Sequence, residues 1–193
     1  MSFAANLEQG KAGESAIARW LIRRGASVLP VYEKIIDEGK GPQVFQIGRS
    51  VIAPDLCVFG KAGVCWVEAK HKEAFTLWRK GGNVFETGID RRHWRDYCTI
   101  RDSIGLPVWL LFLHRGGQAK DSPPSPAGLF GSEIQDLRAN VSHESELWGS
   151  SGMIYWTRTV DGGPLQLLAA YDKVVLANEK AETRRQTPPE RNA

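Results

Sequence analysis

The spacing of apolar residues changes several times along the chain between a helical period and a strand period. Helical spacing predicts an amphipathic helix over residues 7–24 that Gly25 ends, and a second helix over 90–104 that Asp90 and Gly105 cap. Four apolar stretches have the length and composition of strands: 28–32, 51–59, 64–70 and 108–113. The last is apolar throughout, which indicates a central strand buried on both faces.

The second and third of these strands are joined by a short turn with glycine at both ends, which predicts a β-hairpin. A turn centred on its middle residues places Leu56 opposite Val67 and Asp55 opposite Glu68. Cross-strand neighbours have Cβ atoms about 5 Å apart, so the two carboxylates should lie side by side. Because side chains alternate along a strand, Lys70 shares a face with Glu68. We therefore expect Asp55, Glu68 and Lys70 to converge.

Two adjacent carboxylates in an apolar hairpin repel each other and are costly to bury. A hard divalent cation such as Mg²⁺ or Mn²⁺ would remove both problems, because it prefers oxygen ligands. The Lys70 ammonium could then orient or help deprotonate a bound water, or neutralise charge on a phosphate oxygen. The alternative is an exposed hairpin face on which a Glu/Lys pair has no function.

The order Pro54-Asp55, twelve residues, then Glu68-Ala69-Lys70 resembles the signature of the PD-(D/E)XK nuclease superfamily. The resemblance implies a restriction-endonuclease-like sandwich and points to the recombination-nuclease or Holliday-junction-resolvase-like branch. It also implies that Asp55 and Glu68 bind the metal, that the Ala69 carbonyl adds a ligand, and that Lys70 assists the attacking water.

Glu14 is placed on the core-facing stripe of the first helix, because Ile17, Ala18 and Leu21 follow it at helical spacings. Residues 10–14 resemble the glycine, three residues, glutamate motif on the first helix of many members of the superfamily, where the glutamate completes the metal site. The alternative is an edge position from which the carboxylate reaches water. Glu33, after the first strand, is a further candidate for the site.

Residues 72–88 show no clean period and are interpreted as a loop or lid. A separate exposed loop is expected at 37–49, where it leads into the hairpin. In this segment aromatic side chains alternate with cations: Lys72, Phe75, Trp78, Arg79, Lys80 and Phe85. The aromatic rings could stack on bases while the cations meet phosphates. The alternative is a satellite apolar cluster beneath a long loop.

The helix over 90–104 begins with Arg91 and Arg92, which extend the expected nucleic-acid surface. His93 and Tyr97 resemble the Q-x-x-x-Y motif of nuclease domains in bacterial recombination helicases, with histidine in place of glutamine. The resemblance suggests substrate contact by these two residues. The alternative for His93 is an ordinary histidine at the edge of the core.

Composition fits one α/β domain over 1–178 and a disordered tail over 179–193, in a chain of 193 residues of which 42% are hydrophobic. The net charge of +3 is small, but residues 61–101 hold nine Lys/Arg against five Asp/Glu. The basic character is therefore local to the candidate site. Beyond residue 115 we expect a connection over 118–128, a helix over 132–140 and strands over 152–160 and 165–171.

Cysteine usage favours a reducing compartment, because Cys57, Cys65 and Cys98 are odd in number and lack the spacing of a zinc site. No apolar run reaches the roughly 18 residues of a membrane span, and no signal peptide pattern begins the chain. We therefore expect a cytoplasmic protein with no membrane partner.

The leading hypothesis is a Mg²⁺- or Mn²⁺-dependent deoxyribonuclease, an endonuclease, that hydrolyses phosphodiester bonds in DNA. Many superfamily members dimerise to cut two strands, so the resemblance also admits a homodimer. Two alternatives stay open. The chain could be a non-catalytic nucleic-acid-binding protein or structural subunit that retains the nuclease fold, or it could have an unrelated α/β fold.

Overall fold

The computed structural model describes residues 3–31, 42–46, 48–118, 122–149 and 151–175. A central sheet of six strands has the order β1-β4-β5-β8-β9-β12. Its strands are β1 Ser27–Pro30, β4 Leu56–Gly60, β5 Gly63–Lys72, β8 Val108–His114, β9 Gly128–Glu133 and β12 Gln166–Ala169. The sheet is mixed, because β5 and β8 run parallel whereas the other neighbours are antiparallel.

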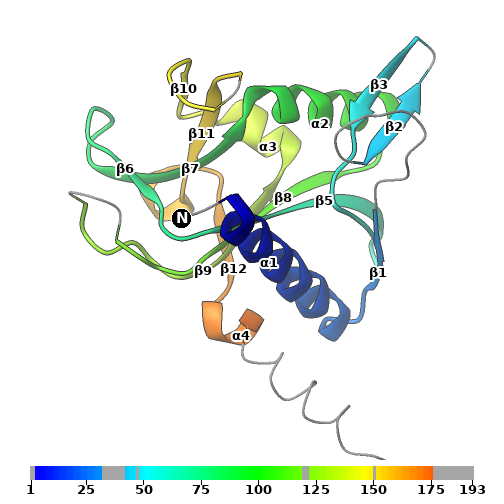
Figure 1. Ribbon diagram of the computed structural model, residues 1–193, viewed down its shortest axis with the longest axis horizontal. Coiled ribbons are helices and arrows are strands. Elements are labelled where there is room, and N and C mark those ends of the chain that lie inside the picture. The colour runs from blue at the N-terminus through cyan, green and yellow to red at the C-terminus, as the bar shows by residue number, and fades with distance from the viewer. Residues whose placement is uncertain (1–2, 32–41, 47, 119–121, 150, 176–193) are drawn as a thin grey trace, which may run out of the picture.

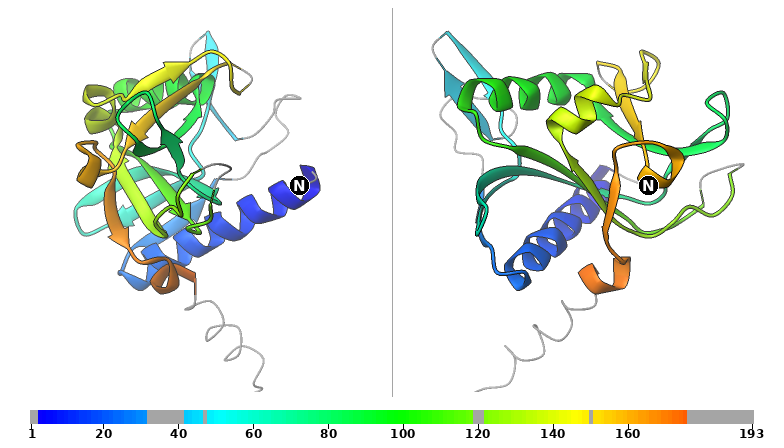
Figure 2. Two further views of the ribbon diagram at one scale, coloured as in Figure 1. Left: turned by 90° about the vertical axis from the view of Figure 1, so that its left-hand side faces the viewer. Right: turned by 180° about the vertical axis from the view of Figure 1, so that it is seen from behind.

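Helices cover both faces of this sheet (Figure 1, Figure 2). Helices α1 (Phe3–Arg23) and α4 (Tyr171–Val175) pack on one face, and α2 (Arg91–Ile104) and α3 (Ile134–Ala139) pack on the other. This arrangement confirms the predicted α/β fold with a central mixed sheet flanked by helices.

A second sheet of four strands, in the order β10-β11-β7-β6, contributes to the core on the α2 side. Its strands are β6 Thr76–Trp78, β7 Val84–Asp90, β10 His143–Ser145 and β11 Met153–Thr157. A separate hairpin of β2 (Gln43–Gln46) and β3 (Arg49–Ile52) lies along α2, where the Ile52 amide donates to the Asp96 carboxylate over 3.1 Å. A short 3-10 helix, Thr159–Asp161, precedes β12.

The β4–β5 hairpin has the predicted register, with Leu56 paired to Val67 and Gly60 paired to Gly63. The predicted strand over 51–59 is divided, however, because it ends at Ile52 as β3 and resumes at Leu56 as β4. The break lets β3 leave the central sheet and pair with β2. It also leaves Asp55 just before β4.

Side chains of β5 and β8 alternate between the two faces, as the strand period requires. Val67 and Ala69 join Leu111 in the core beneath α1, whereas Leu110 and Phe112 join the core beneath α2 and the second sheet. Strand β5 pairs with β4 from Gly63 to Val67 and with β8 from Trp66 to Lys72, so it is held along its whole length. The charged residues between its apolar positions therefore have a fixed direction, toward the α2 side.

Both long helices agree with the pattern in the sequence. Helix α2 has the predicted N-cap, where the Asp90 carboxylate accepts from the Arg92 amide over 2.9 Å, and the predicted left-handed C-cap at Gly105. Helix α1 begins at Phe3, before the predicted start, and Gly25 follows it with a φ of 87°. Glycine tolerates that backbone conformation.

The predictions over 37–49 and 72–88 were partly wrong. Strands β2 and β3 form a hairpin where an exposed loop was expected, and β6 and β7 form another where a lid was expected. Strand β6 has three residues, too few to show a period. Parts of the first loop, part of the 118–128 connection, Glu33 and the predicted tail lie outside the described residues.

The later elements are shorter than predicted, and the helix over 132–140 begins at Ile134 because β9 occupies 128–133. Strands β11 and β12 lie within the predicted strands over 152–160 and 165–171. In the described part of the chain, no helix is both long and apolar enough to cross a membrane.

Helix α1 approaches β5 closely at Gly13, where a Cβ atom would overlap the Cβ atom of His71. Gly10, one turn earlier, has no atom within 4 Å of such a position. We expect Gly13→Ala to destabilise the protein by about 1–3 kcal/mol through overpacking.

Gly10→Ala is the matched control, since both changes gain similar helix propensity and Gly10→Ala should stabilise by about 0.5–1 kcal/mol. Urea unfolding of both variants measures the difference. Equal stability of the two would mean that α1 does not depend on contact at Gly13.

Candidate active site

Asp55 and Glu68 meet at the open end of the β4–β5 hairpin. Asp55 precedes the Leu56–Val67 pair directly, and its Oδ2 atom accepts a hydrogen bond from the Ala69 amide over 2.9 Å. This bond ties the carboxylate to the strand that carries Glu68. The predicted apposition of the two carboxylates is therefore present in the geometry.

Glu68 is 1% exposed, so its carboxylate is removed from water. Its Oε1 atom forms an ion pair with the Lys70 ammonium from the same face of β5. Its Oε2 atom is buried and has no hydrogen-bond partner in the described part of the chain. A buried acceptor without a partner is costly, so this oxygen is available to a ligand.

The charges of the site act strongly on one another. Burial, and then the Glu68 charge, raise the pKa of Asp55 to about 8, although Lys70 and the Ala69 amide oppose the shift. Burial alone would lower the pKa of Lys70, but the Glu68 and Asp55 carboxylates raise it above its usual value. Lys70 is thus held as an ammonium ion, while Asp55 resists ionisation unless another cation is present.

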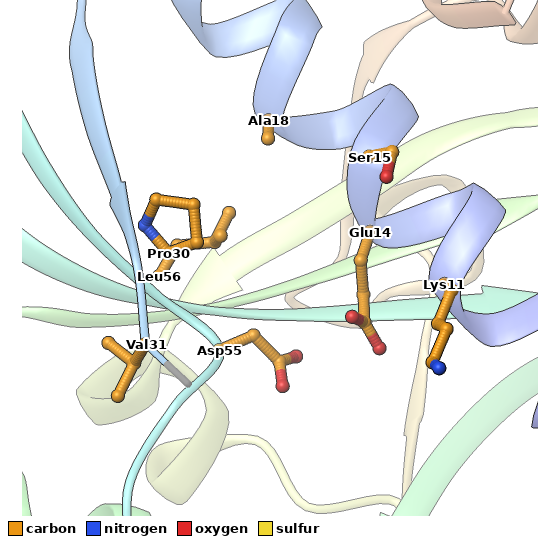
Figure 3. Close-up of a pocket in the computed structure, with 8 residues that line it drawn as sticks. All are labelled: Lys11, Glu14, Ser15, Ala18, Pro30, Val31, Asp55 and Leu56. Carbon is orange, nitrogen blue, oxygen red and sulfur yellow. The ribbon is translucent and has the colours of Figure 1, made fainter. Parts of the chain in front are cut away.

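Glu14 reaches the same region from α1. Together with Asp55 and Lys11 it lines a pocket of about 440 Å³, and Figure 3 shows the Glu14 and Asp55 carboxylates directed toward a common space. Burial raises the pKa of Glu14, Lys70 lowers it and Glu68 raises it, so Glu14 interacts electrostatically with the charged residues of β5.

The prediction that Glu14 lies on the core-facing stripe needs correction. The most buried positions of α1 are Ala16, Ile17 and Trp20, and Glu14 lies beside this stripe with partial exposure. An edge position was the alternative from the sequence, but here the edge faces the pocket. Sequence reasoning missed Lys11, although its helical spacing of three from Glu14 was a usable signal.

The residues present fit a hard divalent cation, although the fit rests on two carboxylates. No group of three His, Cys, Asp or Glu side chains is gathered for a metal among the described residues. Asp55 and Glu68 nevertheless supply oxygen atoms, one of them without a partner in the described part of the chain, in a site where their mutual repulsion favours a cation. Mg²⁺ binds through one or two carboxylates and keeps several waters, so a third side chain is not required.

The prediction that Tyr97 contacts the substrate is also corrected. Its side chain is 1% exposed, so it cannot touch DNA directly. Its phenol lies beside Glu68: burial, then the Glu68 charge and a hydrogen bond to Glu68, raise the pKa of Tyr97 well above the usual value. His93 follows the same face of α2, with its ring 6.0 Å from the Tyr97 ring, and is partly exposed. Tyr97 therefore packs behind the site.

The other residues predicted to contact nucleic acid are scattered. Arg79 and Lys80 are exposed in the β6–β7 turn, and Arg92 is exposed at the start of α2. Arg91 also begins α2, but it forms ion pairs with Glu144 and Glu146 at 3.1 and 2.6 Å. Its charge is therefore largely neutralised within the protein.

Trp78 and Lys72 do not lie on a lid, where the sequence had placed them. The Trp78 ring stacks on His143 with centroids 4.4 Å apart, and Gly81 packs so closely that a Cβ atom there would overlap the ring. Trp78 thus belongs to the second sheet, as in the alternative of a satellite apolar cluster. Lys72 is the last residue of β5 and shares the face of Glu68 and Lys70.

No protein-family model matches this chain, and no curated protein matches its sequence. Among solved structures, a similar chain is Hjc, a Holliday junction resolvase from the archaeal hyperthermophile Archaeoglobus fulgidus. The alignment covers 80% of this chain and 94% of the resolvase, with 10% identity and a TM-score of 0.47. The function proposed below therefore rests on the geometry of the site.

The raised pKa of Asp55 predicts a pH-dependent stability in EDTA. An unfolded aspartate loses its proton near its ordinary pKa of 3.8, whereas folded Asp55 keeps it up to about pH 8. Folded Asp55 therefore binds more protons in this interval, and its contribution to stability should fall as pH rises from about 4 to 8. Asp55→Asn should remove this contribution.

Urea unfolding at pH 5 and pH 8.5 tests the difference between the two proteins. Glu86, whose pKa burial raises to about 7, contributes a similar slope to both. Asp172→Asn, at an exposed position, is the control and should behave as the wild type. Identical slopes for wild type and Asp55→Asn would contradict the assigned burial of this carboxyl.

Proposed function

We propose that this protein is a divalent-metal-dependent nuclease, an endonuclease that hydrolyses phosphodiester bonds in DNA. The observation that carries the proposal is the burial of Glu68 beside Asp55, with one Glu68 oxygen unpartnered among the described residues and the other paired to Lys70. A structural ion pair would need one carboxylate, and the second raises the electrostatic cost of the site.

In this proposal the carboxylates of Asp55 and Glu68 and the backbone carbonyl of Ala69 hold Mg²⁺ or Mn²⁺. When bound, such an ion would supply Lewis-acid stabilisation of a phosphate oxygen and a water of lowered pKa. The hydrogen bond from the Ala69 amide keeps Asp55 directed at the site. Glu14, from the opposite wall of the pocket, would orient water or complete the ion's coordination.

Lys70 would act through its charge. Because neighbouring carboxylates raise its pKa, the amine stays protonated and is a poor proton acceptor. Its proposed roles are therefore to donate a hydrogen bond that orients the attacking water and to stabilise the negative charge that develops on the phosphate. Of the roles considered from the sequence, deprotonation of water is the one this environment disfavours.

DNA is proposed as the substrate because the protein combines a site suited to phosphoryl chemistry with exposed cations. Arg79, Lys80 and Arg92 are exposed, and the segment 61–101 has an excess of four positive charges over negative ones. Such cations bind the phosphate backbone without reading sequence. A homodimer would place two such sites on one duplex.

A cleavage panel tests the proposal most directly. Labelled linear, nicked, flapped, four-way and circular DNAs would be incubated with Mg²⁺, Mn²⁺ or EDTA. Cleavage that needs the metal is the expected result, and cutting of closed circles would establish endonuclease action. Tight DNA binding without cleavage in any metal would instead favour the non-catalytic alternative.

Separate roles for Asp55 and Lys70 give a sharper prediction. Asp55→Asn should weaken both Mn²⁺ affinity, measured by calorimetry, and cleavage. Lys70→Ala should keep metal and DNA binding but lose about two or more orders of magnitude in cleavage rate, the usual scale for such groups. Lys70→Arg should not restore full activity, because a guanidinium has a different shape and hydrogen-bonding geometry.

Lys61→Ala is the matched control, since Lys61 is exposed in the turn of the same hairpin. It should cleave as the wild type does. Near-wild-type cleavage by Lys70→Ala at saturating metal would rule out the proposed role of Lys70.

The β6–β7 turn generates a prediction about DNA binding. Replacing Arg79 and Lys80 together with Ala should weaken binding and reduce the slope of log K against log salt by about 0.9 for each phosphate that the protein no longer neutralises. The control is the double variant Lys61→Ala/Lys173→Ala, which removes two exposed cations elsewhere. An unchanged slope in the Arg79/Lys80 variant would show that the turn faces away from DNA.

A further inference from the structure

His114, the last residue of β8, is enclosed by aromatic rings although it is a polar residue. It has no exposed surface. Its ring stacks on Phe75 at a centroid distance of 3.7 Å and an interplanar angle of 10°, and the Phe130 and Phe112 rings lie 6.0 and 6.4 Å away. A phenylalanine would suit these surroundings in shape and polarity.

Both ring nitrogens of His114 are buried, and neither has a hydrogen-bond partner in the described part of the chain. Burial, and then the charges of Lys72 and His71, lower the pKa of His114 to about 3, so the ring is neutral at physiological pH. A neutral imidazole offers one acceptor and one donor. Leaving both unused costs stability, which suggests that this residue has a role other than packing.

Lys72 lies next to His114 on the adjacent strand. The two residues are register partners in the parallel pair of β5 and β8, so their side chains leave adjacent strands on the same face. That face also carries Glu68 and Lys70. Lys72 lies two residues beyond Lys70, which corresponds to about 6.6 Å along a parallel strand.

The amine of Lys72 differs from that of Lys70 because no carboxylate holds it. Among the described residues none forms an ion pair or hydrogen bond with the Lys72 amine, whereas the Lys70 amine is paired with Glu68. Burial and then the Lys70 charge lower the pKa of Lys72 to about 8, so the amine is still mostly protonated at neutral pH. A partly buried, unneutralised ammonium beside an active site is suited to a phosphate.

We propose that Lys72 binds the phosphate next to the scissile one, and that His114 is a positioning residue. Its ring nitrogens, unpartnered among the described residues, lie on the strand beside Lys72, and one of them accepts a hydrogen bond from the Lys72 amine when the phosphate is bound. The inference rests on the proposed nuclease function for its substrate. The two lysines are two positions apart on β5, and this distance is similar to the spacing between neighbouring phosphates of one nucleic-acid strand. Lys70 then serves the phosphate that is cleaved and Lys72 its neighbour, which favours polynucleotides over single-phosphate substrates.

A double-mutant cycle on DNA binding tests this inference without cleavage. Binding of the full chain to a labelled duplex is measured against salt concentration in Ca²⁺, which takes the same oxygen ligands. Lys72→Gln should weaken binding about five- to tenfold and reduce the salt slope by about 0.9, corresponding to one phosphate. His114→Phe should weaken binding in the wild type but change it less than about twofold in Lys72→Gln, because coupled residues are not additive.

Two further readouts separate positioning from packing. His114→Phe should unfold at an equal or higher urea concentration than the wild type, because it removes buried nitrogens without partners. His114→Gln, which keeps an acceptor, should retain more DNA affinity than His114→Phe. In steady-state cleavage, Lys72→Gln should raise KM for DNA by about fivefold or more and change kcat by less than about twofold, while Lys61→Gln changes neither.

The outcomes are distinct. Unchanged affinity and salt slope in His114→Phe, or equal effects of that change in both backgrounds, would overturn the pairing of His114 with Lys72. Coupled losses of binding in a protein that cleaves no DNA would reject the proposed nuclease function and leave the phosphate site standing. A wild type that binds no DNA would overturn both.

Discussion

The burial of two carboxylates side by side is the constraint on which this structure depends. Asp55 and Glu68 repel each other, and burial deprives each of water. Neighbouring groups reduce the cost only in part, through the Ala69 amide, the Lys70 ammonium and the Tyr97 phenol. The result is a site with excess negative potential and, among the described residues, an unpartnered oxygen. A scaffold with no ligand would gain stability by replacing the second carboxylate, Asp55, with an amide.

Such a site needs a rigid support, and β5 provides one. It is hydrogen-bonded to β4 on one side and β8 on the other, and both of its faces are covered. Alternation along the strand sends Val67 and Ala69 into the core beneath α1 and sends Glu68 to the opposite face. Gly13 then allows α1 to approach closely enough for Glu14 to reach the pocket.

The hairpin and its register could be predicted from the sequence because local rules determine them. A glycine-flanked turn fixes which residues face each other, and the strand period fixes which share a face. The caps of α2 and the apolar run of β8 are signals of the same local kind. For these elements the apolar pattern and the tertiary environment agree.

Other features could not be predicted because they depend on contacts between distant segments. Strand β9 contains two glycines and reads as a loop, yet a Cβ atom at Gly131 would overlap the Leu111 side chain of β8. Strands β6 and β7 look irregular in the sequence: β6 has only three residues, and the aromatic rings of Trp78 and Phe85 contact His143 and Phe75. A motif resemblance linked Tyr97 to substrate contact, but the packing of α2 shows that it is buried beside Glu68.

The lysines of β5 show how one strand can provide two kinds of cation. Lys70 and Lys72 share a face and both lose hydration, yet the pKa of Lys70 is raised while that of Lys72 is lowered to about 8. The difference follows from distance to the carboxylates, because Lys70 is paired with Glu68 whereas Lys72 has the positive charge of Lys70 as its neighbour. A phosphate approaching Lys72 would therefore supply the counter-charge that the described part of the protein does not. The ammonium of Lys70 already has its counter-charge, so a phosphate would have to share it with Glu68, and that exchange becomes favourable only when another cation takes over the Glu68 carboxylate. In the proposed nuclease, binding of metal and binding of the scissile phosphate would therefore be coupled through the Lys70–Glu68 ion pair.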